Sequence, residues 1–266
     1  GLGVMGFHSF LQANNIPRES VMAKVWNKKM FKHIRGQCDD ASISLGKERG
    51  ACPDAADFGF DDRFSNKLAI APTASISIIC GGASPGIEPS AANVYNHKTL
   101  SGSFVVRNPY LEKLLELKGR NDEETWTTVT TAQGSVKDLD CLDDHEKAVF
   151  KTAFEIDQRW LVEHAADRAP FICQSQSLNI FLPANVHKRD LHQIHMMAWK
   201  RGVKSLYYCR SLSIQRAEAV SGDAMADQLG DRALTTFVPE SAGPAPLPLG
   251  TPPAATNDYE ECLSCQ

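Results

Sequence analysis

Residues 178–208, LNIFLPANVHKRDLHQIHMMAWKRGVKSLYY, decide the fold class. Short apolar runs at 178–182 and 203–208 are typical of buried strands. Between them, Asn185 and Asp190 open a segment with helical character. A strand, a helix and a second strand in this order favour parallel pairing of the two strands. The sequence therefore predicts an α/β protein.

Upstream of this unit the apolar residues are spaced for helices. Met22, Trp26 and Met30 recur every four positions, which is the stripe of an amphipathic helix. Such patterns predict helices over residues 21–34, 108–118, 143–166 and 190–201. A short apolar run predicts one more strand over residues 68–71.

Composition and charge restrict the possible partners. With 266 residues, of which 42% are hydrophobic, the chain is long enough for one good hydrophobic core. A net charge of -4 gives no general reason to bind nucleic acid or an anionic membrane, so a small anionic substrate needs a local site. No apolar run approaches the length of a membrane span, and the first residues lack the basic flank of a signal peptide. We expect a soluble, intracellular protein.

The character of the sequence changes at about residue 217. Six prolines follow among Ala, Gly and Thr with almost no periodicity: Pro239, Pro244, Pro246, Pro248, Pro252 and Pro253. This composition predicts a flexible, partly extended tail over residues 217–266, after a folded part over residues 1–216. At its other end the chain starts without Met, inside a predicted helix, so we expect a piece of a longer protein.

Cys262 and Cys265 form a Cys-x-x-Cys at the end of the predicted tail. The position suits a dithiol that travels and exchanges with a disulfide. A zinc site needs two more ligands, and none stands nearby, while a redox-inert end is the remaining alternative. We expect most of the other cysteines to be small buried thiols. These are Cys38, Cys52, Cys80, Cys141, Cys173 and Cys209.

Small residues and hydroxyls follow the predicted strand over residues 68–71. Residues 71–77, APTASIS, stand where the chain could turn into a helix. Free backbone N–H groups at a helix start, with Ser or Thr hydroxyls beside them, can bind an anion. An ordinary capping turn has the same composition, so both interpretations stay open.

A second loop, GGASPGIEP at residues 81–89, places flexible and rigid residues around one carboxylate, Glu88. Such a composition suits the close approach of backbone to a ligand. Glu88 is a candidate base or ligand-facing acceptor. A structural salt bridge is the simpler interpretation of that side chain.

Tyr207 and Tyr208 close the predicted strand over residues 203–208. Adjacent strand residues point to opposite faces, so ordinary packing of one tyrosine explains the pair. Tyrosine can also be oxidised to a neutral radical when its proton can leave, and a stacked pair makes a hopping path. From the residues alone, packing is the simpler interpretation.

Together these motifs resemble the large subunit of class I ribonucleotide reductases. The matching stretches are GLGVMG at 1–6, GACP at 50–53, PTAS at 72–75, GIEP at 86–89, LSGSF at 100–104, SQSLNI at 175–180, LYY at 206–208 and CLSC at 262–265. The resemblance is continuous over residues 1–211 and returns at the tip of the tail. Each motif alone is weak, but the ordered set is specific.

The resemblance implies a substrate site at the first of the two loops. The diphosphate of a ribonucleoside diphosphate would be held, through main-chain N–H groups and hydroxyls, by Thr73, Ala74, Ser75 and Ile76. Ile76 stands where many relatives carry a hydroxyl residue, so only a backbone contact is expected there.

The resemblance also implies two redox roles. Tyr207 and Tyr208 match the tyrosine pair that passes an oxidising equivalent from the small subunit to an active-site cysteine. The metal cofactor of that small subunit supplies the radical, and this chain itself binds no cofactor. Cys262 and Cys265 match the tail dithiol that reduces the active-site disulfide and is itself reduced by thioredoxin or glutaredoxin.

The family's central chemistry needs residues that precede this chain. A cysteine thiyl radical takes a hydrogen from the ribose 3′ carbon, the 2′ hydroxyl leaves as water, and two further cysteines supply the electrons. The cysteines before the tail match none of these, and the nucleotide effectors bind the missing amino-terminal part. We therefore expect a cytoplasmic fragment that is inactive alone, acts with an amino-terminal half, and binds neither membrane nor nucleic acid.

The implied fold is the second half of a ten-stranded α/β barrel, followed by a flexible tail. An isolated half-barrel exposes sheet edges and apolar surface, so it should associate with the missing half or aggregate.

Two alternatives to a class I reductase stay open. One alternative is a cobalamin-dependent (class II) reductase, which needs no tyrosine pair between subunits. The other is a non-catalytic phosphate-binding scaffold, which has no use for a mobile dithiol.

Overall fold

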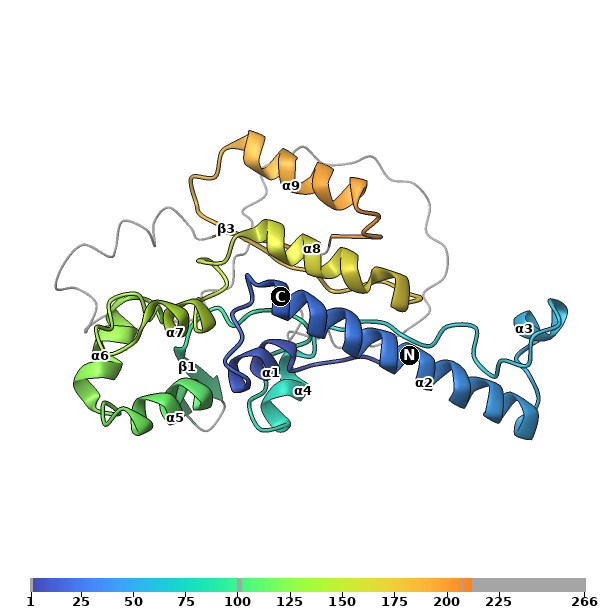
Figure 1. Ribbon diagram of the computed structural model, residues 1–266, viewed down its shortest axis with the longest axis horizontal. Coiled ribbons are helices and arrows are strands. Elements are labelled where there is room, and N and C mark those ends of the chain that lie inside the picture. Colours follow the sequence, from blue (N-terminus) through green and yellow to red (C-terminus); the bar gives the residue numbers. More distant parts are fainter. Residues whose placement is uncertain (1, 100–101, 207, 212–266) are drawn as a thin grey trace, which may run out of the picture. The chain divides into compact units, whose positions relative to one another are not determined.

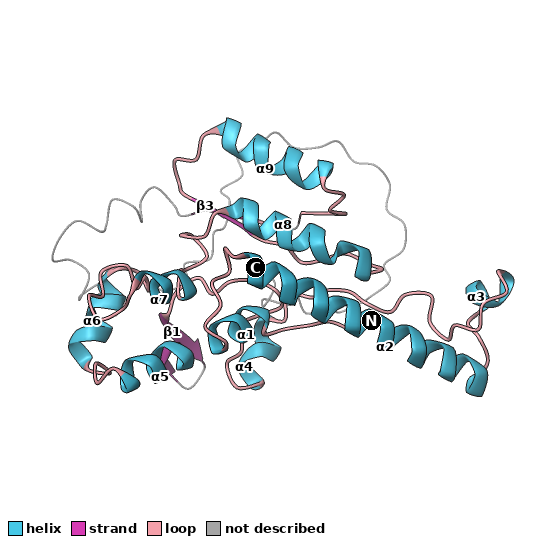
Figure 2. Ribbon diagram, in the orientation of Figure 1, coloured by secondary structure: helices cyan, strands magenta, loops and turns pink. Residues whose placement is uncertain are grey.

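The fold is that of a computed structural model, which describes residues 2–99, 102–206 and 208–211. Helices predominate and the strands are short, as Figures 1 and 2 show. In chain order the elements are α1 (Phe7–Ala13), α2 (Val21–Arg49), α3 (Pro53–Asp57), α4 (Ala74–Ile79), β1 (Val94–Thr99), β2 (Gly102–Arg107), α5 (Pro109–Leu117), α6 (Glu123–Thr131), α7 (Asp144–Val149), α8 (Gln158–Arg168), the 3₁₀ helix η1 (Ala169–Phe171), β3 (Ile180–Leu182), α9 (Lys188–Lys200) and β4 (Cys209–Ser211).

Extended segments that are far apart in the sequence pair in parallel within the fold. Leu2 bridges Leu68, and Ile70 bridges Gln176, both in the parallel sense. The segment that contains Gln176 leads into β3, which pairs in parallel with β4. The antiparallel hairpin of β1 and β2 stands apart from these pairs. Parallel strands linked by helical crossovers are characteristic of an α/β fold, so the predicted α/β fold class is confirmed.

The predicted strand–helix–strand unit is confirmed, but its second strand lies further along the chain. β3 and β4 flank α9 and pair in parallel. Because β4 begins at Cys209, the prediction of a strand over residues 203–208 is wrong. In that segment the Lys204 ammonium donates hydrogen bonds to the carbonyl oxygens of residues 172–174. These bonds tie the segment to the chain that leads into β3.

Three predicted helices are confirmed, each with a side-chain cap. α2 begins at Val21 and is longer than predicted, and the Ser20 hydroxyl accepts the Ala23 N–H at its start. α5 begins after Asn108, whose side chain accepts the Tyr110 N–H. The predicted helix over residues 190–201 begins slightly earlier, as α9, and the preceding His187 side chain accepts an N–H at its start.

The single helix predicted over residues 143–166 is wrong. α7 ends at Val149 and α8 begins only at Gln158. Between them the Glu155 carboxylate accepts hydrogen bonds from the N–H and the hydroxyl of Thr152. Local side-chain acceptors of this kind compete with the helical pairing of the backbone. The strand predicted over residues 68–71 is likewise reduced to isolated bridges.

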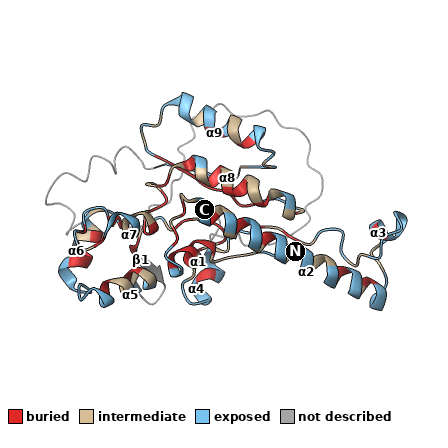
Figure 3. Ribbon diagram, in the orientation of Figure 1, coloured by how far each residue is buried: buried red, intermediate tan, exposed pale blue. Residues whose placement is uncertain are grey.

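The core has two apolar clusters. In the first, α8 packs against both α2 and α9, and these helices lie side by side in Figure 1. Figure 3 shows buried residues along α8 and an exposed outer face on α9. The second cluster lies among α5, α6 and α7 and includes Leu111, Leu115, Trp126, Val129 and Val149. The sequence patterns did not predict α6 or the β1–β2 hairpin.

A glycine on α2 allows residues 61–63 to pass against that helix. A Cβ atom at Gly46 would lie 1.6 Å from the carbonyl oxygen of Asp61. The Arg63 N–H donates to the Ser42 carbonyl at 3.0 Å, and the Phe64 N–H donates to the Ser42 hydroxyl at 3.2 Å. The backbone therefore has little room to move away from a larger residue.

Gly46→Ala should destabilise the fold by about 3 kcal/mol or more, because the added methyl group overlaps backbone that hydrogen bonds hold in place. Gly36, on the same helix, is the matched control, since a Cβ there meets nothing within 4 Å. Gly36→Ala should stabilise by about 0.5–1 kcal/mol through helix propensity. Thermal unfolding checks both variants. An unchanged melting temperature for Gly46→Ala would contradict the close contact of residues 61–63 with α2 at Gly46.

Two buried histidines lie close to a buried arginine. Burial first, and the charge of Arg18 second, lower the pKa of His8 and of His164 to about 3. The His164 ring also contacts the Arg18 carbonyl oxygen at 2.9 Å. Both rings are therefore neutral in the folded protein over most of the pH range.

Stability should fall as the pH drops below about 6.5. An unfolded histidine binds a proton near that pH, whereas the folded ones bind only near pH 3, so the unfolded state carries more protons in between. The slope approaches about 1.4 kcal/mol per pH unit for each ring. Urea unfolding at about pH 7 and about pH 5 measures the loss, which should be smaller in His8→Gln. An equal loss in both proteins would exclude His8 as a cause.

Candidate functional site

The first predicted loop ends in a short helix, as the sequence indicates. Ala74 is the first residue of α4, and Thr73 precedes it with a left-handed φ of 54°. The first N–H groups of a helix have no partner within the helix. Ser75 and Ile76 are exposed beside these groups. Thr73 makes no side-chain cap to the helix, so this turn differs from an ordinary capping turn and leaves the helix start open.

Thr73 joins the first loop to the second. Its Oγ1 atom accepts a hydrogen bond from the Gly86 N–H at 2.8 Å. Gly86 has a φ of 49°, and a Cβ atom there would lie 2.9 Å from the Ala71 carbonyl oxygen. A glycine is therefore needed for this approach, and the two loops form one unit.

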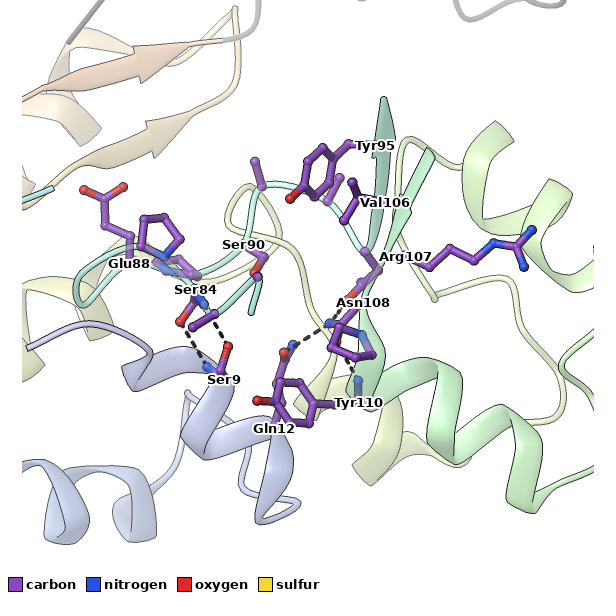
Figure 4. Close-up of a pocket in the computed structure, with 18 of the residues that line it drawn as sticks. Ser9, Gln12, Ser84, Glu88, Ser90, Tyr95, Val106, Arg107, Asn108 and Tyr110 are labelled. Atoms are coloured by element: carbon purple, nitrogen blue, oxygen red, sulfur yellow. Dashed lines mark hydrogen bonds between the residues drawn. The ribbon is translucent and has the colours of Figure 1, made fainter. Parts of the chain in front are cut away.

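The amino-terminal end of α1 fixes the second loop. Ser9 and Ser84 exchange two hydrogen bonds, in which each backbone N–H donates to the other's hydroxyl, at 3.1 and 2.9 Å. Figure 4 shows this reciprocal pair. The Gly6 N–H also donates to the Ser84 carbonyl at 2.8 Å. The loop is therefore attached to α1 on one side and to Thr73 on the other.

Glu88 lies in the second loop and faces an amide. Its Oε1 atom accepts a hydrogen bond from the Nδ2 of the buried Asn179 at 2.6 Å. Within the described part of the chain Glu88 forms no ion pair, so the salt-bridge interpretation is wrong there. Burial raises the pKa of Glu88, while Asn179, Arg210 and Arg18 act in the opposite direction. Glu88 also lines a pocket beside this loop.

A pocket of about 520 Å³ lies between the second loop, α1 and the β1–β2 hairpin. Figure 4 shows its polar residues, among them Ser9, Gln12, Glu88, Ser90, Tyr95, Asn108 and Tyr110. On one side the Asn108 amide donates to Gln12 at 3.1 Å and to Asn93 at 2.8 Å. Residues 73–76 do not line this pocket, so it is separate from the open helix start.

Tyr208 stands immediately before β4 and is 42% exposed. Its carbonyl oxygen accepts the Ile180 N–H at 2.9 Å, which begins the pairing of β3 with β4. The Arg210 guanidinium lies over its ring, 5.8 Å from the ring centre. Tyr207, Cys262 and Cys265 lie outside the described residues.

The prediction that most other cysteines are buried is wrong. Cys80 and Cys209 are exposed, and the remaining four are only partly buried. Cys173 is held in place, because its sulfur accepts the N–H groups of Lys67 and Leu68 at 3.0 Å each. Among the residues the structure describes, no group of His, Cys, Asp and Glu could hold a metal ion. In the same residues, no helix has the length and apolarity to span a bilayer.

Two polar residues around the two loops gave no signal in the sequence. Arg18 and Gln12 are buried and contact loop or pocket residues through side-chain hydrogen bonds, but neither stands in a motif or a periodic pattern. Asn179 is also buried and binds Glu88, and it lies within the stretch SQSLNI that the sequence analysis singled out without giving it a role.

A family description, "Ribonucleotide reductase, barrel domain", matches residues 1–63 and 58–209 of the chain. The chain belongs to the ribonucleotide reductase family. The resemblance inferred from the ordered motifs is thereby confirmed.

Similar proteins include two viral ribonucleotide reductases. The ribonucleoside-diphosphate reductase large subunit of Invertebrate iridescent virus 6 is 46% identical, over 86% of this chain and 24% of its own length. That of Invertebrate iridescent virus 3 is 43% identical, over 83% of this chain and 35% of its own length. A solved structure, the Actinobacillus ureae class Id ribonucleotide reductase alpha subunit, aligns with a TM-score of 0.74 at 41% identity.

That alignment covers 80% of this chain and 39% of the alpha subunit of the bacterial reductase. The chain thus spans between a quarter and two fifths of the length of these reductase subunits. The names of these similar proteins favour the class I interpretation over the cobalamin-dependent alternative.

Proposed function

We propose that this chain is the carboxyl-terminal part of the catalytic subunit of a ribonucleoside-diphosphate reductase. In the complete enzyme it would help to convert ribonucleoside diphosphates to deoxyribonucleotides by radical chemistry. The observation that carries the proposal is the open start of α4, with Thr73 attached to Gly86 instead of capping the helix. A reductase needs such a fixed anion site to orient its substrate.

The diphosphate group would bind at the open helix start. The N–H groups of Ala74, Ser75 and Ile76 point along the start of α4, where the helix dipole favours negative charge. Ser75 offers a hydroxyl to the same ligand, and Ile76 offers only its backbone. The Thr73 hydroxyl accepts the Gly86 N–H through a lone pair, so its own O–H group would still be able to donate to the diphosphate.

Tyr207 and Tyr208 would carry the oxidising equivalent from the small subunit toward the active site. The partial exposure of Tyr208 suits a residue that receives it from a partner protein. Cys262 and Cys265 would reduce the active-site disulfide after each turnover and then be reduced by thioredoxin or glutaredoxin.

The proposed architecture is the second half of a ten-stranded α/β barrel over residues 1–216, with a flexible tail over residues 217–266. The parallel neighbours of Leu68 and Ile70 support this arrangement, because a barrel is built from such pairs. Exposed apolar residues on α4, namely Ile76, Ile78 and Ile79, would be covered by the amino-terminal half.

The proposed partners are the amino-terminal half of the large subunit, the small subunit, and a nucleoside diphosphate. The metal cofactor of the small subunit would supply the radical, this chain would bind no cofactor, and nucleotide effectors would bind the amino-terminal part. The enzyme would work in the cytoplasm, where thioredoxin or glutaredoxin keeps its thiols reduced.

We expect the chain alone to produce no deoxyribonucleotide, because the residues that break the carbon–oxygen bond are not in it. Activity should appear when it is combined with a matching amino-terminal half, the small subunit and a thiol reductant. Product formation from a ribonucleoside diphosphate measures the effect, and omission of the small subunit is the control. Turnover by the isolated chain would contradict the assignment of the bond-breaking residues to the amino-terminal half.

Tyr208→Phe should abolish turnover in that complete enzyme, since phenylalanine cannot release a phenolic proton and an electron at an accessible potential. Substrate binding, measured by equilibrium dialysis, should stay within about twofold because the helix start is unchanged. Trp199→Phe is the control, as Trp199 is an exposed aromatic residue on α9, outside both the pocket and the proposed path. Retained turnover in Tyr208→Phe would remove Tyr208 from the radical path.

A further inference from the structure

Arg18 is a fully buried cation, with a side chain only 2% exposed. Its Nη2 atom donates a hydrogen bond to the Ile87 carbonyl oxygen at 2.5 Å. Its guanidinium lies 5.5 Å from the centre of the Phe7 ring, and it forms no ion pair with any described carboxylate. A buried charge is costly for the fold unless it is well compensated, so its presence calls for a reason.

Ile87 lies between Gly86 and Glu88, the two residues of the second loop that contact Thr73 and Asn179. On one side, the Gly86 N–H donates to Thr73 Oγ1 at 2.8 Å. On the other side, Glu88 accepts the Asn179 amide at 2.6 Å. The hydrogen bond from Arg18 therefore acts on the Ile87–Glu88 peptide group, which lies between these two contacts along the chain.

The helix start needs such support from outside. Thr73 has a left-handed φ of 54°, which strains a residue other than glycine, so neighbouring contacts have to maintain it. The Gly86 N–H supplies the contact that reaches the Thr73 side chain. α1 holds the other end of the loop through Ser9 and Ser84, as Figure 4 shows.

We infer that Arg18 is a positioning residue for the diphosphate site of the proposed function. By binding the Ile87 carbonyl it keeps Gly86 against Thr73, and Thr73 in turn keeps the start of α4 open. Arg18 touches no substrate in this scheme and acts only through the second loop. The role of Arg18 in substrate binding rests on the proposed function. Its effect on the contact between Gly86 and Thr73 does not.

Arg168 provides a matched comparison inside the same core. It is fully buried and lies over the same Phe7 ring, at 5.9 Å. Its side-chain hydrogen bonds go to Gln176 and Asn27, and to neither of the two loops. The two arginines therefore share burial, charge and ring contact, and differ in the loop contact.

The test compares Arg18→Met, Arg18→Lys and Arg168→Met in the complete enzyme, by kcat, KM for the nucleoside diphosphate, and amide hydrogen exchange of residues 71–88. Arg18→Met should raise KM roughly tenfold with kcat within about twofold, since a loosened site binds substrate less well in the ground state. Exchange at Gly86 should become faster. Arg18→Lys should partly restore KM, because an ammonium can still donate to the Ile87 carbonyl.

Arg168→Met should lower the melting temperature without changing KM or the exchange of the loops. Equal effects of Arg18→Met and Arg168→Met on KM and on loop exchange would reduce Arg18 to a structural residue and overturn the inference. If Arg18→Met does not fold, Arg18→Lys and Thr73→Val form a double-mutant cycle, in which the inference requires non-additive effects on KM and additivity rejects it.

Failure of the proposed function can be distinguished from failure of the Arg18 inference. If the proposed function is wrong, the unmutated complete enzyme reduces no nucleotide. Faster exchange of the Gly86 amide in Arg18→Met, without the same change in Arg168→Met, would still support the positioning role. Unchanged exchange would refute it whether or not the enzyme reduces nucleotides.

Discussion

The parallel pairing of Leu68 and Ile70 with their neighbours is the constraint on which the rest of this fold depends. Leu68 lies beside Leu2, and Ile70 lies beside Gln176. The pairing is close, because a Cβ atom at Gly3 would lie 2.9 Å from the Ala69 carbonyl oxygen. The chain leaves these pairs just after Ile70 and reaches the start of α4 within four residues, so their position fixes where that helix begins.

The candidate site is built by convergence on one loop. α1 holds Ser84, Arg18 holds Ile87, and Asn179, just before β3, holds Glu88. These contacts come from segments that are far apart along the chain. A loop with several glycines could adopt many conformations, and the convergence of separate elements is what selects one of them.

The sequence predicted the parts of this fold that depend on local patterns. The stripe of Met22 and Trp26 predicted α2, and the order of strand, helix and strand predicted the parallel pairing of β3 with β4. The helix start after Thr73 followed from its small residues and hydroxyls. In each case the signal lies within a few neighbouring residues, where periodicity and capping chemistry act.

The parts that the sequence did not predict depend on distant contacts. The end of α7 is set by Glu155 binding back to Thr152, and the position of β4 follows from Lys204 binding an earlier segment. Arg18 reads as one more basic residue until its neighbours are known. The attachment of Thr73 to Gly86 could not be anticipated either, because composition says nothing about which loop meets which.

The separation of the paired segments along the chain also has a consequence for biosynthesis. Ile70 cannot pair with Gln176 until the intervening chain has been made, which takes about 5 to 20 seconds at ordinary rates of translation. Over that interval one side of the Leu68–Ile70 segment offers unpaired backbone groups and apolar side chains to other molecules. Chains that are still incomplete are therefore more prone to aggregate through this segment than the finished fold is.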